Sequence, residues 1–219
     1  MDTRTSFHQN VDELQQSLLK MGNLVEESIS NAVDALAKLD DKLAKKIVVE
    51  DDIIDGMMLE IEERCLRLIA LQQPMAGDLR IIGTALKIAT DLERISDHAV
   101  DIAKIAIRLS GEELIKPLED IPHMAVLVRE MLHESLLSYT ERNIHRAAAL
   151  AEKDDEVDKL YSSLMNEIIG MMNSEFARNR QLSHLMFVAH YLERVADHCT
   201  NIGEGVIYIV TGKRKDLNI

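Results

Sequence analysis

The sequence predicts an all-α protein of two tandem, pseudo-symmetric antiparallel three-helix bundles, with six long helices in all. Composition is the first of three observations behind this prediction. Aromatic residues make up only 3% of the chain, Trp is absent and Met occurs 11 times, while 47% of residues are hydrophobic. Such a core must be aliphatic and thioether-rich, which suits helices better than sheets.

Apolar periodicity is the second observation. In segments 88–106 and 188–206, apolar residues recur at alternating spacings of four and three, which is typical of the buried seam of a packed helix. The two seams are Ile88, Leu92, Ile95, Ala99, Ile102 and Ala106, and then Val188, Leu192, Val195, Cys199, Ile202 and Val206.

An internal repeat is the third. The motif Leu-Glu-Arg-x-x-Asp-His occurs at 92–98 and returns at 192–198, an offset of 100 residues. The acidic stretch 51–55 returns at 154–158, an offset of 103. Self-similarity of this kind indicates that one three-helix unit was duplicated.

The first half divides into three helices. They are expected over 6–39, from Asp40 or Asp41 as N-cap to residue 71, and from Asp78 as N-cap to residue 110. Gly111 follows the third helix in the position where glycine usually ends one.

The second half follows the same plan. Helices are expected over 124–142, 144–172 and 177–210, the last closed by Gly212, and Pro117 and Pro122 mark the break between halves. The predicted domains are therefore 1–112 and 117–219.

The net charge of −13 argues against nucleic acid as a partner, because phosphate backbones require Lys and Arg surfaces. Cys65 and Cys199 are far apart in the chain and are expected to be buried thiols. The N-terminal residues have no apolar stretch behind them, and no run reaches the ~18 apolar residues of a membrane span. A cytoplasmic protein is expected.

Carboxylates recur at helical spacing in both copies and form the candidate metal-binding rows. Like charges four residues apart destabilise a helix by about 0.2–0.5 kcal/mol per pair, so a purely solubilising surface would place Lys or Arg between them. A solvated acidic face explains one such row, whereas the duplicated placement favours ligands. The rows comprise Asp51, Asp55, Glu93, Asp97 and Asp101 in the first copy, and Asp154, Asp158, Glu193, Asp197 and Asn201 in the second.

These rows offer hard oxygen ligands and no thiolate, which suits Fe, Mn, Mg or Ca and suits Zn less. The neighbouring His98 and His198 are expected at a helix interface or in solvent. Arg94 and Arg194 are expected to be structural and to pair either across helices or with Asp97 and Asp197. No catalytic motif is present: the sequence has no Walker A loop, no nucleophile elbow and no pair of Glu-x-x-His motifs. A non-enzymatic protein is expected.

The chain resembles the PhoU family over essentially its whole length. The resemblance is carried by Gln-Gln-Pro-x-Ala-x-Asp-Leu-Arg at 72–80, by Leu-Lys-Ile at 86–88 and by the repeated Leu-Glu-Arg-x-x-Asp-His motif, with Phe7 and segment 14–22 at the start. Members are cytoplasmic accessory proteins of the phosphate-specific ABC importer and negative regulators of the phosphate-starvation response.

The resemblance implies two symmetric three-helix bundles, a homodimer, and contact with the importer's ATPase subunit and the phosphate-sensing histidine kinase. It also implies metal, chiefly iron, with Mn, Mg or Zn as alternatives, at the rows listed above. Asn201 departs from the acid that is common there. Two other readings stay open: a carboxylate-bridged metalloenzyme of ferritin-like character, and a metal-free acidic helical scaffold.

Overall fold

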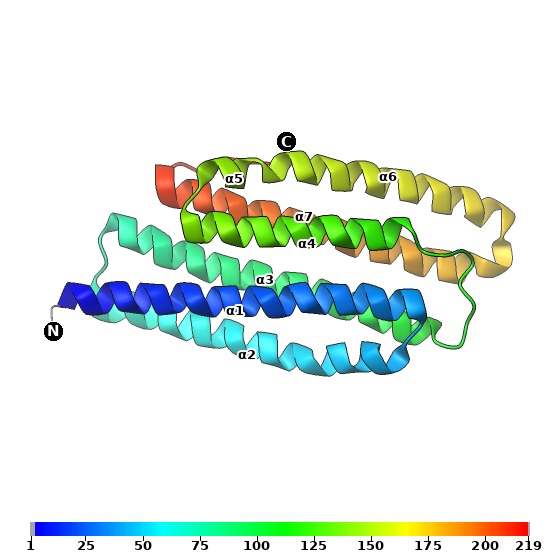
Figure 1. Ribbon diagram of the computed structural model, residues 1–219, viewed down its shortest axis with the longest axis horizontal. Coiled ribbons are helices and arrows are strands. Elements are labelled where there is room, and N and C mark those ends of the chain that lie inside the picture. The colour runs from blue at the N-terminus through cyan, green and yellow to red at the C-terminus, as the bar shows by residue number, and fades with distance from the viewer. Residues whose placement is uncertain (1–2, 219) are drawn as a thin grey trace.

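The computed structural model describes residues 3–218, and every long element in it is a helix (Figure 1). The prediction of an all-α fold with six long helices is confirmed. In chain order the elements are α1 (Thr3–Lys38), α2 (Asp41–Gln72), α3 (Ala76–Leu109), α4 (Asp120–Glu141), the short α5 (Ile144–Ala148), α6 (Leu150–Ser174), the 3₁₀ turn η1 (Phe176–Arg178) and α7 (Asn179–Thr211).

The two halves lie side by side, with their long helices running along the long axis of the molecule (Figure 1). Helices α1, α2 and α3 pack together, as do α4, α6 and α7. The halves meet where α3 packs along α7 and α1 along α4. One hydrophobic core therefore runs through both halves.

Two of the predicted helix ends agree with the structure. Asp40 caps α2, since its carboxylate accepts hydrogen bonds from the backbone N–H groups of Lys42 (3.0 Å) and Leu43 (3.1 Å). Gly212 ends α7 with a φ of 70°, a conformation that costs glycine little. The prediction of Asp78 as the cap of α3 is wrong: Met75 is the N-cap residue, and Asp78 lies in the first turn.

The helix expected over 144–172 is interrupted at Ala149, between α5 and α6. No Gly or Pro marks the interruption. Helix α5 packs closely on α7 at Gly203, where a Cβ would lie 3.1 Å from the carbonyl oxygen of Ala147. Helix α4 also begins earlier than expected, because Pro122 fits into its first turn, where a missing N–H breaks no helical hydrogen bond.

The predicted seams form the centre of the core. All twelve seam residues are at most 1% exposed, and both cysteine side chains are fully buried. Burial raises the pKa of the Cys65 thiol to about 11, so the neutral thiol prevails. The cysteines are structural, as expected.

Polar contacts cross the packed surface between α3 and α7, which we call the central seam. His198 Nδ1 lies 3.0 Å from Asp91 Oδ1, and both side chains are largely buried. The His98 ring stacks on Tyr191, with ring centroids 5.5 Å apart, and lies 5.8 Å from the His198 ring. With the 100-residue offset, the pair Asp91–His198 is the symmetry equivalent of Tyr191–His98.

The segment 212–218 folds back along α7. The backbone N–H of Leu217 donates to Glu204 Oε1 (3.0 Å), and Asn218 Nδ2 donates to Asp197 Oδ1 (2.8 Å). Within residues 3–218, no helix is long and apolar enough to cross a membrane.

Candidate functional site

The structure brings four carboxylates together in each half. The first acidic site lies between α2 and α3, and the second lies between α6 and α7. Within each site, burial and the charges of neighbouring carboxylates raise the pKa of several members, and like charges have this effect at short range. The groups with a raised pKa are Asp51, Glu93, Asp154, Asp158 and Glu193. The first acidic site comprises Asp51, Asp55, Glu93 and Asp97, and the second comprises Asp154, Asp158, Glu193 and Asp197.

Burial and neighbouring charge act together at the first acidic site. Burial raises the pKa of Asp51, and the charges of Asp55 and Asp97 raise it further. Ser96 opposes this, because its hydroxyl donates to Asp51 Oδ1 at 2.6 Å and stabilises the ionised form. Burial likewise raises the pKa of Glu93, whose side chain is 18% exposed.

The second acidic site is the more strongly perturbed of the two. Burial, followed by the charges of Asp158 and Asp197, raises the pKa of Asp154 to about 7. The difference from Asp51 has a visible cause: Ala196 stands where the first copy has Ser96, so no hydroxyl stabilises the Asp154 carboxylate.

Each site also holds an arginine, as the sequence predicts. Arg94 Nη1 lies 3.1 Å from Asp97 Oδ2, and Arg194 Nη1 lies 2.5 Å from Asp197 Oδ2. In the second acidic site, Glu193 Oε2 is buried without a hydrogen-bond partner, and His190 Nδ1 lies 3.4 Å from it.

Two predicted row members lie outside these clusters. Asp101 pairs with Lys104 (3.4 Å), and its charge adds to burial in raising the pKa of Tyr191, so it acts on α7 across the central seam. Asn201 is half-buried one turn beyond Asp197. The sequence analysis missed Asn218, which bonds Asp197, and Ser96; the difference between Ser96 and Ala196 was visible in the repeat.

The donor set of each acidic site suits a hard cation, since it consists of carboxylate oxygens with too little counter-charge. The orphaned Glu193 Oε2 and the raised pKa of Asp154 are what a site lacking a cation would show. No three His, Cys, Asp or Glu side chains within 3–218 already converge on one point, however. A cation would compete with Arg94 and Arg194 for Asp97 and Asp197.

Electrostatic crowding predicts that Asp154→Asn stabilises the protein. The pKa of Asp154 is about 7 in the folded protein and 3.8 for an ordinary Asp carboxyl, so the ionised form destabilises the fold above pH 7. This destabilisation fades as pH falls from about 7 toward 4. The free energy of unfolding at pH 8 should rise by about 1–2 kcal/mol in the variant and be unchanged at pH 4. Urea denaturation in chelator at both pH values measures it.

Glu156→Gln is the matched control, because Glu156 is exposed on the same helix and its charge does not contribute to the raised pKa of Asp154. It should change stability little at either pH. Ala196→Ser in the otherwise wild-type chain should give part of the same rise in the free energy of unfolding, because it gives Asp154 the hydroxyl partner that Asp51 has. A gain for Asp154→Asn that is equal at pH 4 and pH 8 would contradict the electrostatic explanation.

The PhoU domain family model matches this chain twice, over residues 18–106 and 121–206. Curated relatives named phosphate-specific transport system accessory protein PhoU homolog match along nearly their whole length. The Clostridium acetobutylicum protein is 45% identical over 217 residues, covering 99% of both chains. The Aquifex aeolicus protein is 40% identical over 203 residues, covering 93% of this chain and 92% of its own.

Solved structures agree. The crystal structure of PhoU from Pseudomonas aeruginosa superposes with a TM-score of 0.90 at 34% identity, covering 94% of this chain and 100% of that one. PhoU from Streptococcus pneumoniae superposes with a TM-score of 0.88 at 34% identity, covering 96% and 99%. With both sequence repeats, the fold and the motifs in agreement, this chain belongs to the PhoU family.

Proposed function

We propose that this protein is a cytoplasmic, non-enzymatic accessory regulator of phosphate uptake that represses the phosphate-starvation response when phosphate is plentiful. It does so by contacting the ATPase subunit of the phosphate ABC importer and the phosphate-sensing histidine kinase. The observation that carries the proposal is similarity over 99% of the chain to a relative named as an accessory protein of phosphate-specific transport.

The arrangement of the helices supports action by contact. The core is filled by aliphatic side chains, and the charged groups lie along the helix edges. The name of the Streptococcus pneumoniae structure describes a phosphate transport system regulatory protein. A rigid helical body with two related acidic sites can present fixed surfaces to two partners.

We further propose that the acidic sites hold metal, with iron first and Mn, Mg or Zn as alternatives. Asp51, Asp55, Glu93 and Asp97 would hold it in one half, and Asp154, Asp158, Glu193 and Asp197 in the other. Asp101 and Asn201 lie at the ends of these rows and would contribute only after a side-chain rearrangement. A bound cation would supply positive charge that neutralises the crowded carboxylates and fixes the α2–α3 and α6–α7 contacts.

Disruption of the gene is expected to leave phosphate-starvation genes switched on in phosphate-rich medium. The physical reason is loss of the contact that holds importer and kinase in the non-signalling state. A reporter behind a starvation-responsive promoter measures this, with the intact gene returned on a plasmid as the control. Co-purification of the importer ATPase and the kinase with the complementing protein tests the contacts directly.

Normal repression in the disrupted strain would refute the regulatory proposal. If repression is lost in the disrupted strain and restored by the plasmid, but neither partner co-purifies, direct contact is refuted and the regulatory role stands. The predicted homodimer is a separate part of the proposal, measured by the mass of the protein in solution.

A metal-free acidic scaffold is the alternative that a specific observation favours. Arg94 and Arg194 already pair with the acidic sites, and no ready ligand set is present within 3–218. Under this alternative the carboxylates dock basic partner surfaces directly. Metal analysis, treated in the Discussion, separates the two.

A further inference from the structure

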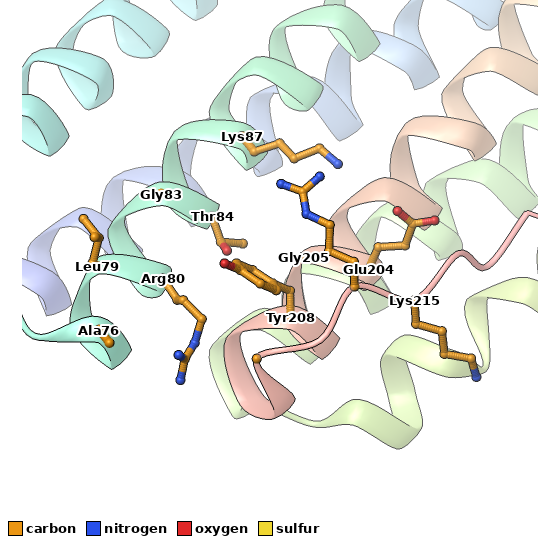
Figure 2. Close-up of a pocket in the computed structure, with 12 residues that line it drawn as sticks. Ala76, Leu79, Arg80, Gly83, Thr84, Lys87, Glu204, Gly205, Tyr208 and Lys215 are labelled. Atoms are coloured by element: carbon orange, nitrogen blue, oxygen red, sulfur yellow. The ribbon is translucent and has the colours of Figure 1, made fainter.

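A basic pocket of about 500 Å³ lies at one end of the central seam (Figure 2). It is lined by the first turns of α3, the last turns of α7 and the returning segment after Gly212. Ligand pockets for small molecules typically measure about 300–1,000 Å³, so this one is large enough for a metabolite.

The charge of the pocket is opposite to that of the protein. Four cationic side chains line it, against one carboxylate, in a chain of net charge −13. The carboxylate, Glu204, already accepts the backbone N–H of Leu217. The four cations are Arg80, Lys87, Arg214 and Lys215. Within residues 3–218, none of them forms an ion pair.

The cations are held in place by the fold. Arg80 and Lys87 are seven residues apart on α3, so they share one helix face, and in Figure 2 Tyr208 lies between them. The Arg214 guanidinium lies over the Tyr208 ring, 5.7 Å from its centroid. Arg80 Nε is buried and has no hydrogen-bond acceptor. A buried donor without an acceptor costs free energy, which an anion in the pocket would recover.

Two glycines shape the floor of the pocket. At Gly205 a Cβ would lie 2.8 Å from Thr84 Cγ2, so its absence lets α3 and α7 approach each other there. At Gly83 a Cβ would meet nothing within 4 Å, so a side chain placed there would enter open space on the pocket wall. The absence of a side chain at Gly83 thus leaves room for a ligand.

From this geometry we propose that the basic pocket binds a small anion carrying two or more phosphoryl groups, of the nucleoside diphosphate and triphosphate class. Arginine forks match phosphoryl oxygens in pairs, and cations from two separate segments, α3 and the chain after Gly212, can engage more than one phosphoryl group. The volume exceeds the needs of a single phosphate ion, and the Tyr208 ring offers a surface for the remainder of the ligand. This inference goes beyond the proposed regulatory function and does not depend on it.

Titration calorimetry with the full chain tests the proposal, in chelator so that no metal links ligand phosphates to the acidic sites. The ligands are ATP, ADP, pyrophosphate, orthophosphate and adenosine. ATP, ADP and pyrophosphate should bind saturably to one site per chain, and adenosine should not. Arg80→Gln/Lys87→Gln should weaken binding at least tenfold. Arg67→Gln/Lys42→Gln is the matched control, since it removes the same charges from exposed positions on α2 and should leave binding intact.

Gly83→Leu provides a test that keeps every charge and should fold, because leucine favours helix more than glycine does. It should weaken ATP and ADP binding at least tenfold, whereas Gly170→Leu, at an equally open glycine on α6, should not. Binding that persists in both pocket variants, or no saturable binding of any phosphoryl ligand, would overturn the proposal. Orthophosphate bound as tightly as ADP would overturn the preference for several phosphoryl groups. If the basic pocket binds none of these ligands but binds an Asp/Glu-rich peptide, the pocket docks a protein and the proposal is overturned.

Discussion

Wild-type protein purified without chelator is expected to carry stoichiometric Fe, Mn or Mg, and the double variant Asp97→Ala/Asp197→Ala is expected to carry none. Asp97 and Asp197 affect the pKa of nearly every other member of their sites, so each lies at the centre of its cluster. Removing them takes away a central ligand in each half. Elemental analysis of untagged protein measures the metal, and far-ultraviolet circular dichroism verifies that the helices remain.

Stability gives a second readout of the same prediction. A ligand present at 100 times its Kd stabilises the folded state by about 2.7 kcal/mol, so the added metal should raise the Tm of wild-type protein by about 5 °C or more. The double variant should show no such rise. Asp12→Ala/Asp34→Ala removes the same charge from exposed positions on α1 and should keep metal and Tm response. Absence of metal in wild type and control alike would make the acidic sites a docking surface.

His198→Leu is expected to lower the free energy of unfolding by about 3 kcal/mol, which corresponds to a Tm lower by about 6–12 °C. Asp91 is 6% exposed and its Oδ2 already lacks a partner, so loss of His198 leaves a buried carboxylate with no hydrogen-bond donor. Urea denaturation followed by circular dichroism measures the change.

The duplication supplies the control for this prediction. His98→Leu alters the equivalent position of the other copy, where the His98 Nδ1 has no hydrogen-bond partner and the ring contacts only the Tyr191 and His198 rings. His98→Leu should lower the free energy of unfolding by about 1 kcal/mol or less. Asp91→Leu/His198→Leu should recover most of the stability lost in the single variant. Equal losses at His98 and His198 would show that ring packing, and not the buried carboxylate, determines the effect.

Much of the fold could be predicted because it depends on local, repeated signals. The four-three spacing of Leu92, Ile95 and Ala99 identifies the buried face without reference to any partner helix. The cap at Asp40 is also local. The break at Ala149 could not be predicted from local signals, because no Gly or Pro marks it. The close approach of α5 to Gly203 beside it joins parts of the chain about 55 residues apart.

The candidate site divides in the same way. The acidic sites could be predicted from i, i+4 spacing and duplication, but the extent of their burial could not, since it depends on how α6 packs on α7. The basic pocket was missed because its cations belong to two segments that are far apart in the chain. Arg80 and Lys87 share one helix face, yet Arg214 joins them only because the chain reverses at Gly212.

The contacts of the central seam bear on the origin of the chain. Residue 91 meets 198, and their counterparts 191 and 98 meet in turn, while His98 and His198 face each other across the middle. This reciprocity is the signature of an isologous, two-fold interface. A single three-helix ancestor could therefore have built the same seam by self-association. Fusion of two such units freed each half from mirroring the other, so that Asp91 could diverge from Tyr191 and Ser96 from Ala196. The two acidic sites, identical in such an ancestor, thereby became tunable one at a time.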